Sequence, residues 1–70
     1  SSSDVDTVCE YVDEMHVLAG QIQHSFPEIR VVDVVWRGGF ILIAIPGHRK
    51  GAIIKRIEET FHCKVEHVHA

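Results

Sequence analysis

Cysteine, proline and aromatic residues are scarce in this 70-residue chain, and it has no apolar run long enough to span a membrane. Its two cysteines, Cys9 and Cys63, are too few for a disulfide scaffold, so we expect a reduced intracellular setting, cytoplasmic or nuclear. The Walker pattern, the dinucleotide glycine motif and any nucleophile–base arrangement are also missing. We therefore predict that the chain is not an enzyme, uses no cofactor and does not insert into a membrane.

Apolar residues make up 46% of the sequence, which is enough for the core of one small domain and leaves a surplus that suggests an oligomer or a partner. We assign residues 1–3 to a tail and residues 4–70 to a single domain, which we expect to be part of a larger protein. The net charge of −3 is unevenly distributed. Residues 1–36 carry seven acids and one base, whereas residues 37–70 carry six bases and three acids.

The first long segment, residues 4–26, has the apolar spacing of a helix, and Pro27 ends the pattern. Its apolar residues recur at alternating intervals of three and four, the spacing of a coiled-coil seam: Val5, Val8, Val12, Met15, Ala19, Ile22 and Phe26. We interpret this stripe as a helix face that packs on a sheet. The alternative is that part of it, widened by Tyr11 and Leu18, also contacts a partner helix.

Two strands are predicted next, over residues 28–36 and 40–45, joined by a hairpin at Gly38 and Gly39, since a glycine pair accepts positive φ. Pairing across this turn predicts a core face that consists of Val32, Val34, Trp36, Ile41, Ile43 and Ile45. The opposite, outer face is unusually apolar, and we predict a contact surface there for a protein partner or a second copy of the chain. Its residues are Val31, Val35, Phe40 and Leu42.

A second helical pattern follows Gly51, and from Cys63 to Val68 the apolar period changes to two, which predicts a third strand. The predicted order is therefore helix, strand, strand, helix, strand (αββαβ). Two helices can cover one face of a three-stranded sheet in this order, so we predict an α+β domain with both helices on the same face.

The loop before the second helix is basic and lies between two glycines, in the sequence Gly47-His48-Arg49-Lys50-Gly51. A loop at a helix start offers unpaired backbone N–H groups and the positive end of the helix dipole. An anion, most naturally a phosphate, can bind at such a place. The alternative is an ordinary tight turn in a strand–helix–strand unit.

The stretch from Gly51 to Val65 resembles the second half of a K-homology (KH) domain. In that family the last glycine of a G-x-x-G loop is followed at fixed intervals by Ile, often Lys, and Ile or Leu, and later by a β-branched residue that begins a strand. Ile54, Lys55, Ile57 and Val65 occupy these positions. The resemblance covers the fifteen residues from Gly51 to Val65. It departs from the family in two ways: three residues separate the loop glycines, and no short helix precedes the loop.

This resemblance implies a module that binds single-stranded RNA, with the backbone phosphates held by the glycine loop. The implied binding residues are Gly47, His48, Arg49, Lys50, Gly51, Lys55 and Arg56, with Ile54 and Ile57 as an apolar floor. A second alignment matches residues 46–54 to the stretch that leads into the KH loop. In that case the loop itself is deleted and the grip on nucleic acid is lost.

The αββαβ order also resembles the cytoplasmic C-terminal domains of cation-diffusion-facilitator transporters, which often end in a strand that bears a histidine. Val65-Glu-His67-Val-His69 is similar to that ending. This resemblance implies an alternative function, a protein-interaction or oligomerisation domain without nucleic acid, including a metal-responsive dimer. Cys63, His67 and His69 have the right chemistry for zinc, but no ligand pair has the spacing of a closed site, so we predict no metal site.

Overall fold

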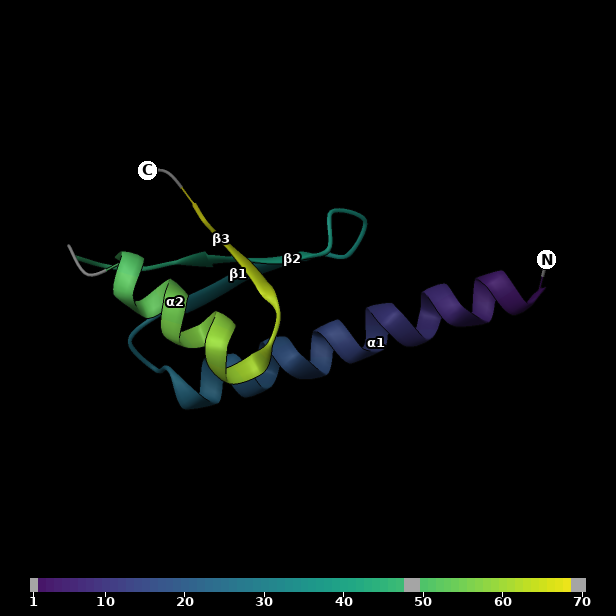
Figure 1. Cartoon of the computed structure of the whole chain (residues 1–70), viewed down its shortest axis with the longest axis horizontal. Helices are drawn as coiled ribbons and strands as arrows, with labels where there is room; N and C mark the ends of the chain where they lie inside the picture. Colours follow the sequence, from purple (N-terminus) through teal and green to yellow (C-terminus); the bar gives the residue numbers. More distant parts are fainter. Residues whose placement is uncertain (1, 48–49, 69–70) are drawn as a thin grey trace.

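The computed structural model describes the backbone of residues 2–47 and 50–68 and the side chains of residues 11–47 and 50–68. Figure 1 shows five elements in the predicted order. They are α1 (Ser2–Ser25), β1 (Arg30–Val35), β2 (Phe40–Ala44), α2 (Lys50–Phe61) and β3 (Lys64–His67). The strands form one mixed sheet with β2 in the centre, antiparallel to β1 and parallel to β3. The predicted α+β class is therefore confirmed.

Helix α1 begins at Ser2, two residues before its predicted start, and is much longer than the surface on which it packs. Among the described side chains, Met15, Ala19 and Ile22 in its C-terminal half belong to the core, and Phe26 follows directly after the helix. The N-terminal half extends away from the sheet, and in Figure 1 none of the other described elements lies beside it. The apolar stripe is thus buried along the C-terminal half of the helix.

The core combines residues of all three strands with residues of both helices. Ile41 and Ile43 of β2 are completely buried, as is Ile57 of α2. The two helices meet where the ring of Phe26 contacts the ring of Phe61 edge-on, with 6.4 Å between the ring centroids. These contacts fix the C-terminal half of α1 against α2.

The hairpin between β1 and β2 has a four-residue loop, Trp36 to Gly39, because the last strand pair is Val35 with Phe40. Gly39 has a positive φ of 73°, a conformation that glycine adopts without steric cost. Gly38 does not adopt positive φ. Gly38 is required for a different reason: a Cβ atom there would come within 2.5 Å of the Phe40 ring.

A β-bulge in β1 changes which valines face the core. The register shifts between Val31, which pairs with Ile43, and Asp33, which pairs with Leu42. Because a bulge adds one residue to a strand, side chains on its two sides no longer follow one alternation. Val31 packs against the core and Val32 is 41% exposed. The prediction of Val32 on the core face and Val31 on the outer face is therefore wrong, whereas Val34, Ile41, Ile43 and Ile45 lie at the core as predicted.

Candidate interaction surfaces

The outer face of the sheet carries an apolar strip, formed by Val35 on β1 and by Phe40, Leu42 and Ala44 on β2. These side chains are half-buried and do not belong to the core, whereas Ile41 and Ile43, which alternate with them along β2, are completely buried. The structure thus places Val35, Phe40 and Leu42 of the predicted contact surface together. Val31, the fourth predicted member, lies at the core.

Charged residues border this strip on both sides. On β3, Lys64 and Glu66 pair in register with Phe40 and Leu42 and form an ion pair of 3.6 Å between Nζ and Oε1. On β1, Arg30 and Asp33 are exposed and pair with Ala44 and Leu42. Each edge of the sheet therefore offers one acid and one base beside the apolar strip, which is the arrangement of an interface with a polar rim.

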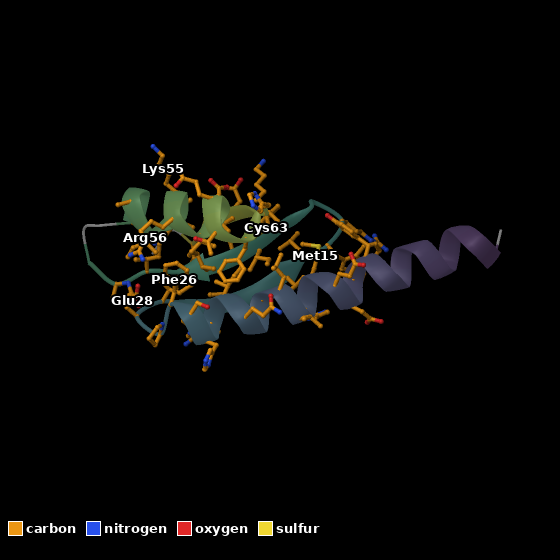
Figure 2. All side chains as sticks on the ribbon, turned by 60° about the horizontal axis from the view of Figure 1, so that its bottom comes forward. Met15, Phe26, Glu28, Lys55, Arg56 and Cys63 are labelled. Carbon is orange, nitrogen blue, oxygen red and sulfur yellow. The ribbon has the colours of Figure 1, made fainter. Side chains whose placement is uncertain are left out.

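The basic residues predicted to bind phosphate have different surroundings. His48 and Arg49 lie outside the described residues. The side chain of Lys55 points away from the core in Figure 2, whereas the guanidinium of Arg56 lies 5.3 Å from the centre of the Phe26 ring. Lys50, at the first residue of α2, is exposed. Lys50, Lys55 and Arg56 are all exposed on α2, and Arg56 also lies against an aromatic ring at the contact between the helices.

The predicted phosphate loop also includes Gly47 and Gly51, and its predicted apolar floor consists of Ile54 and Ile57. Gly47 has a positive φ of 93°, and a Cβ atom at Gly47 or Gly51 would meet no atom within 4 Å. Ile54 packs against the core, and Ile57 is completely buried. Ile57 therefore belongs to the core, and an exposed groove would have to be lined by other residues.

A cleft of about 250 Å³ opens at the place where α1 leaves the sheet, and nothing in the sequence indicated it. It lies between α1, the hairpin turn and the connection from α2 to β3, near the labelled Met15 and Cys63 in Figure 2. The residues that line it are Tyr11, Glu14, Met15, Leu18, Gly39, His62, Cys63 and Lys64. Its floor is apolar, and its charged groups are one acid and one base from opposite sides.

Cys63 lines this cleft as a half-buried free thiol. Burial and, to a lesser extent, the neighbouring Glu58 carboxylate raise the pKa of Cys63 above its ordinary value of 9.0. Because only the thiolate is a strong nucleophile, a raised pKa describes an unreactive cysteine near neutral pH. Glu58 also has a structural role, since its Oε2 accepts the backbone N–H of Val65 at 3.1 Å.

The residues considered as zinc ligands do not form a site in the described part of the chain. No group of three or more His, Cys, Asp or Glu residues is placed there to hold a metal ion. Nε2 of His67 instead accepts the backbone N–H of Ile45 at 3.4 Å, and His69 lies outside the described residues. His67 thus connects β3 to the end of β2.

No family model, no curated protein and no solved structure matches this chain. The resemblances to KH domains and to transporter C-terminal domains stay predictions. In the described part of the chain, neither helix has the length and apolar character needed to cross a membrane.

Proposed function

We propose that this chain is a protein-association domain that self-associates through the outer face of its sheet. The observation that carries this proposal is the apolar strip of Val35, Phe40, Leu42 and Ala44, which is separate from the core. Burying apolar surface stabilises an interface by about 25 cal/mol per Å² before the costs of association are subtracted. An apolar strip along the central strand of a small sheet can supply this stabilisation when a partner covers it.

The charges beside the strip favour a second copy of the chain as the partner. Both edges of the outer face carry one acid and one base, Arg30 and Asp33 on β1 and Lys64 and Glu66 on β3. When two copies pack face to face about a two-fold axis, the β1 edge of one copy can lie over the β3 edge of the other. Each base of one copy then lies near an acid of the other copy, and this register is favoured over one that places like charges opposite each other.

Sedimentation measurements over a range of micromolar concentrations test this function. We expect concentration-dependent association that Leu42→Asp weakens at least tenfold, because the substitution places a charge in the middle of the strip. Val17→Asp is the matched control, since Val17 is apolar and 62% exposed but lies on α1, away from the outer sheet face. A wild-type chain that stays monomeric throughout, or equal effects of the two substitutions, would reject the proposal.

Single-stranded RNA binding is a second candidate, favoured by the exposed Lys50 and Lys55 on a helix whose first turn has no acidic residue. If these lysines contact phosphates, RNA affinity falls with salt, and each lost contact lowers the slope of log K against log salt by about 0.7. Titrations at two salt concentrations should then show weaker binding and a smaller slope for Lys50→Asp and Lys55→Asp. Arg37→Asp, at the hairpin, has the same charge change and should have little effect. Wild-type protein without salt-dependent RNA binding would exclude this function.

A further inference from the structure

A second unpartnered surface lies at the base of α1, on a different part of the molecule from the outer sheet face. It consists of the cleft described above and of the part of α1 that extends beyond the sheet (Figure 1). Met15, Leu18 and Cys63 supply apolar groups to the cleft, and Tyr11, which is 44% exposed, lies at its outer end. The cleft and the projecting helix thus form one continuous surface.

The apolar stripe of α1 continues beyond the residues that belong to the core. Val12 is half-buried but is not part of the core, and Met15, one turn further along, is buried. Val17, on another side of the helix, is 62% exposed. In the sequence, the three- and four-residue spacing of the core residues continues through Val12 toward the N-terminus, to Val8 and Val5. The spacing of a helix-pairing seam therefore extends beyond the part of α1 that the sheet covers.

We propose that the projecting half of α1 pairs in antiparallel orientation with the same segment of a second copy, and that the N-terminal turns of each helix occupy the cleft at the base of the other. The thirteen residue steps from Ser2 to Met15 span about 20 Å of helix, which is enough to reach from one cleft to the other. Because such a contact is symmetric about one two-fold axis, it covers both projecting helices and both clefts at once.

Charge selects the antiparallel orientation. Residues 2–14 contain five acids and no lysine or arginine. A parallel pair would bring the five acids of one helix alongside the five of the other, which is unfavourable. In the antiparallel pair the acidic N-terminal turns lie beside Lys64 and His62 at the rim of the cleft. Glu14, on the opposite wall, has the same sign as the incoming helix, so we expect that helix to lie nearer Lys64.

This contact goes beyond the proposed function, because it is a second self-association surface that does not use the outer sheet face. A chain with two different two-fold contacts forms tetramers or longer assemblies, whereas a chain with one forms dimers only. The size of the assembly therefore reports on the two contacts separately. The loss of one contact should leave a dimer held by the other.

Sedimentation of the wild type and four variants tests this assignment. We expect assemblies larger than a dimer for the wild type, dimers for Val12→Asp and for Leu42→Asp, and monomers for the double variant. Val17→Asp is the matched control on the same helix and should behave as the wild type. Circular dichroism of Val12→Asp should show an intact fold, because Val12 is outside the core. Unchanged assembly of Val12→Asp would overturn the α1 contact, whereas unchanged assembly of Leu42→Asp would overturn only the sheet contact.

Cross-linking tests the occupant of the cleft. In a Cys9→Ser background, Asp6→Cys places a thiol on the N-terminal turns, and diamide at mildly alkaline pH should join it to Cys63 of another copy. Nine residue steps, about 13 Å of helix, separate position 6 from Met15 of the same chain, so a link within one chain is not expected. Val17→Cys in the same background should not form the link. Association without a link at position 6 would show that something other than the antiparallel helix fills the cleft, and would overturn the inference.

Discussion

Val31 donates its backbone N–H to Oε1 of Gln23 at 2.9 Å, although eight residues separate them in the sequence. The other end of the same side chain, Nε2, donates to the backbone carbonyl of Ile29 at 2.7 Å. One amide group therefore joins the end of α1 to the first residues of β1. It does so next to the bulge, where backbone groups of an edge strand lack regular strand partners.

Replacing Gln23 with Glu should therefore destabilise the domain. The carboxylate can still accept the N–H of Val31, but it cannot donate to the carbonyl of Ile29 and it repels that oxygen. We expect a loss of about 1–2 kcal/mol in the free energy of unfolding, measured by urea denaturation. Gln23→Ala should cost a similar amount, because it removes both hydrogen bonds. His24→Ala, at the exposed neighbouring position, is the control, and an equal loss there would show that the Gln23 contacts contribute nothing.

This contact also explains why the order of elements could be predicted from the sequence and the register of β1 could not. Apolar periods of 3.6 and 2 indicated all five elements, and their ends differ from the prediction by a few residues. In β1, however, four valines (Val31, Val32, Val34 and Val35) are equally suited to either face. No glycine or proline marks the bulge. The choice of face is associated with a hydrogen bond from a different element, which a local pattern does not contain.

The two candidate surfaces also differ in how far the sequence predicts them, because a local pattern does not contain contacts between distant elements. The outer face follows from alternation along a single strand, and Phe40 and Leu42 lie there as predicted because β2 is regular. The cleft needs α1, the hairpin turn and the α2–β3 connection at fixed distances from one another. Tyr11 and Cys63, more than fifty residues apart, line it together only because of the tertiary packing.

His62 should be replaceable by glycine with a gain in stability. It is the residue after α2, where its N–H still bonds to the Glu58 carbonyl at 2.9 Å, and its φ is +54°. Left-handed backbone costs a non-glycine residue roughly 1 kcal/mol, and glycine is the preferred residue at this helix position. We expect His62→Gly to raise the free energy of unfolding by about 0.5 kcal/mol, the remainder being lost to chain entropy.

The comparison for that experiment is His62→Val. A β-branched side chain is poorly tolerated at positive φ, so this variant should be less stable than the wild type, by about 1 kcal/mol. Thermal denaturation of the three proteins under one set of conditions gives the order directly. A glycine variant that is less stable than the valine variant would contradict the role assigned to this backbone position.

Ile57 should not tolerate truncation, because it is completely buried between α2 and the sheet. Ile-to-Ala substitutions in cores cost about 2–5 kcal/mol, and a 70-residue domain has little stability to lose. We expect Ile57→Ala to be largely unfolded by circular dichroism and Ile57→Val to fold with a loss of about 1 kcal/mol. Val32→Ala is the exposed control. A folded, nearly unchanged Ile57→Ala would instead agree with a place in an open groove.

The thiol of Cys63 should become more reactive when the charge of Glu58 is removed. Glu58→Gln keeps an oxygen that can accept the N–H of Val65 but removes the negative charge that raises the pKa of Cys63. In a Cys9→Ser background, the pH profile of alkylation by iodoacetamide should shift to lower pH in this variant. The pKa should stay above 9.0, because burial is the larger cause of the shift. Identical profiles with and without the Glu58 charge would contradict this account.

The raised pKa of Cys63 also makes the stability of the domain depend on pH, and the direction of this dependence follows from the direction of the pKa shift. A folded-state pKa above the unfolded value means that the native state holds the thiol proton more tightly, so stability falls as pH rises. The contribution is fully present below pH 9.0 and is lost as the pH rises through the folded-state pKa of Cys63. Urea denaturation on both sides of this range measures it, with Cys63→Ser as the reference for lysine and tyrosine titration. The wild type should lose more stability than Cys63→Ser in this range, and Glu58→Gln should lie between them, because only part of the shift comes from its charge.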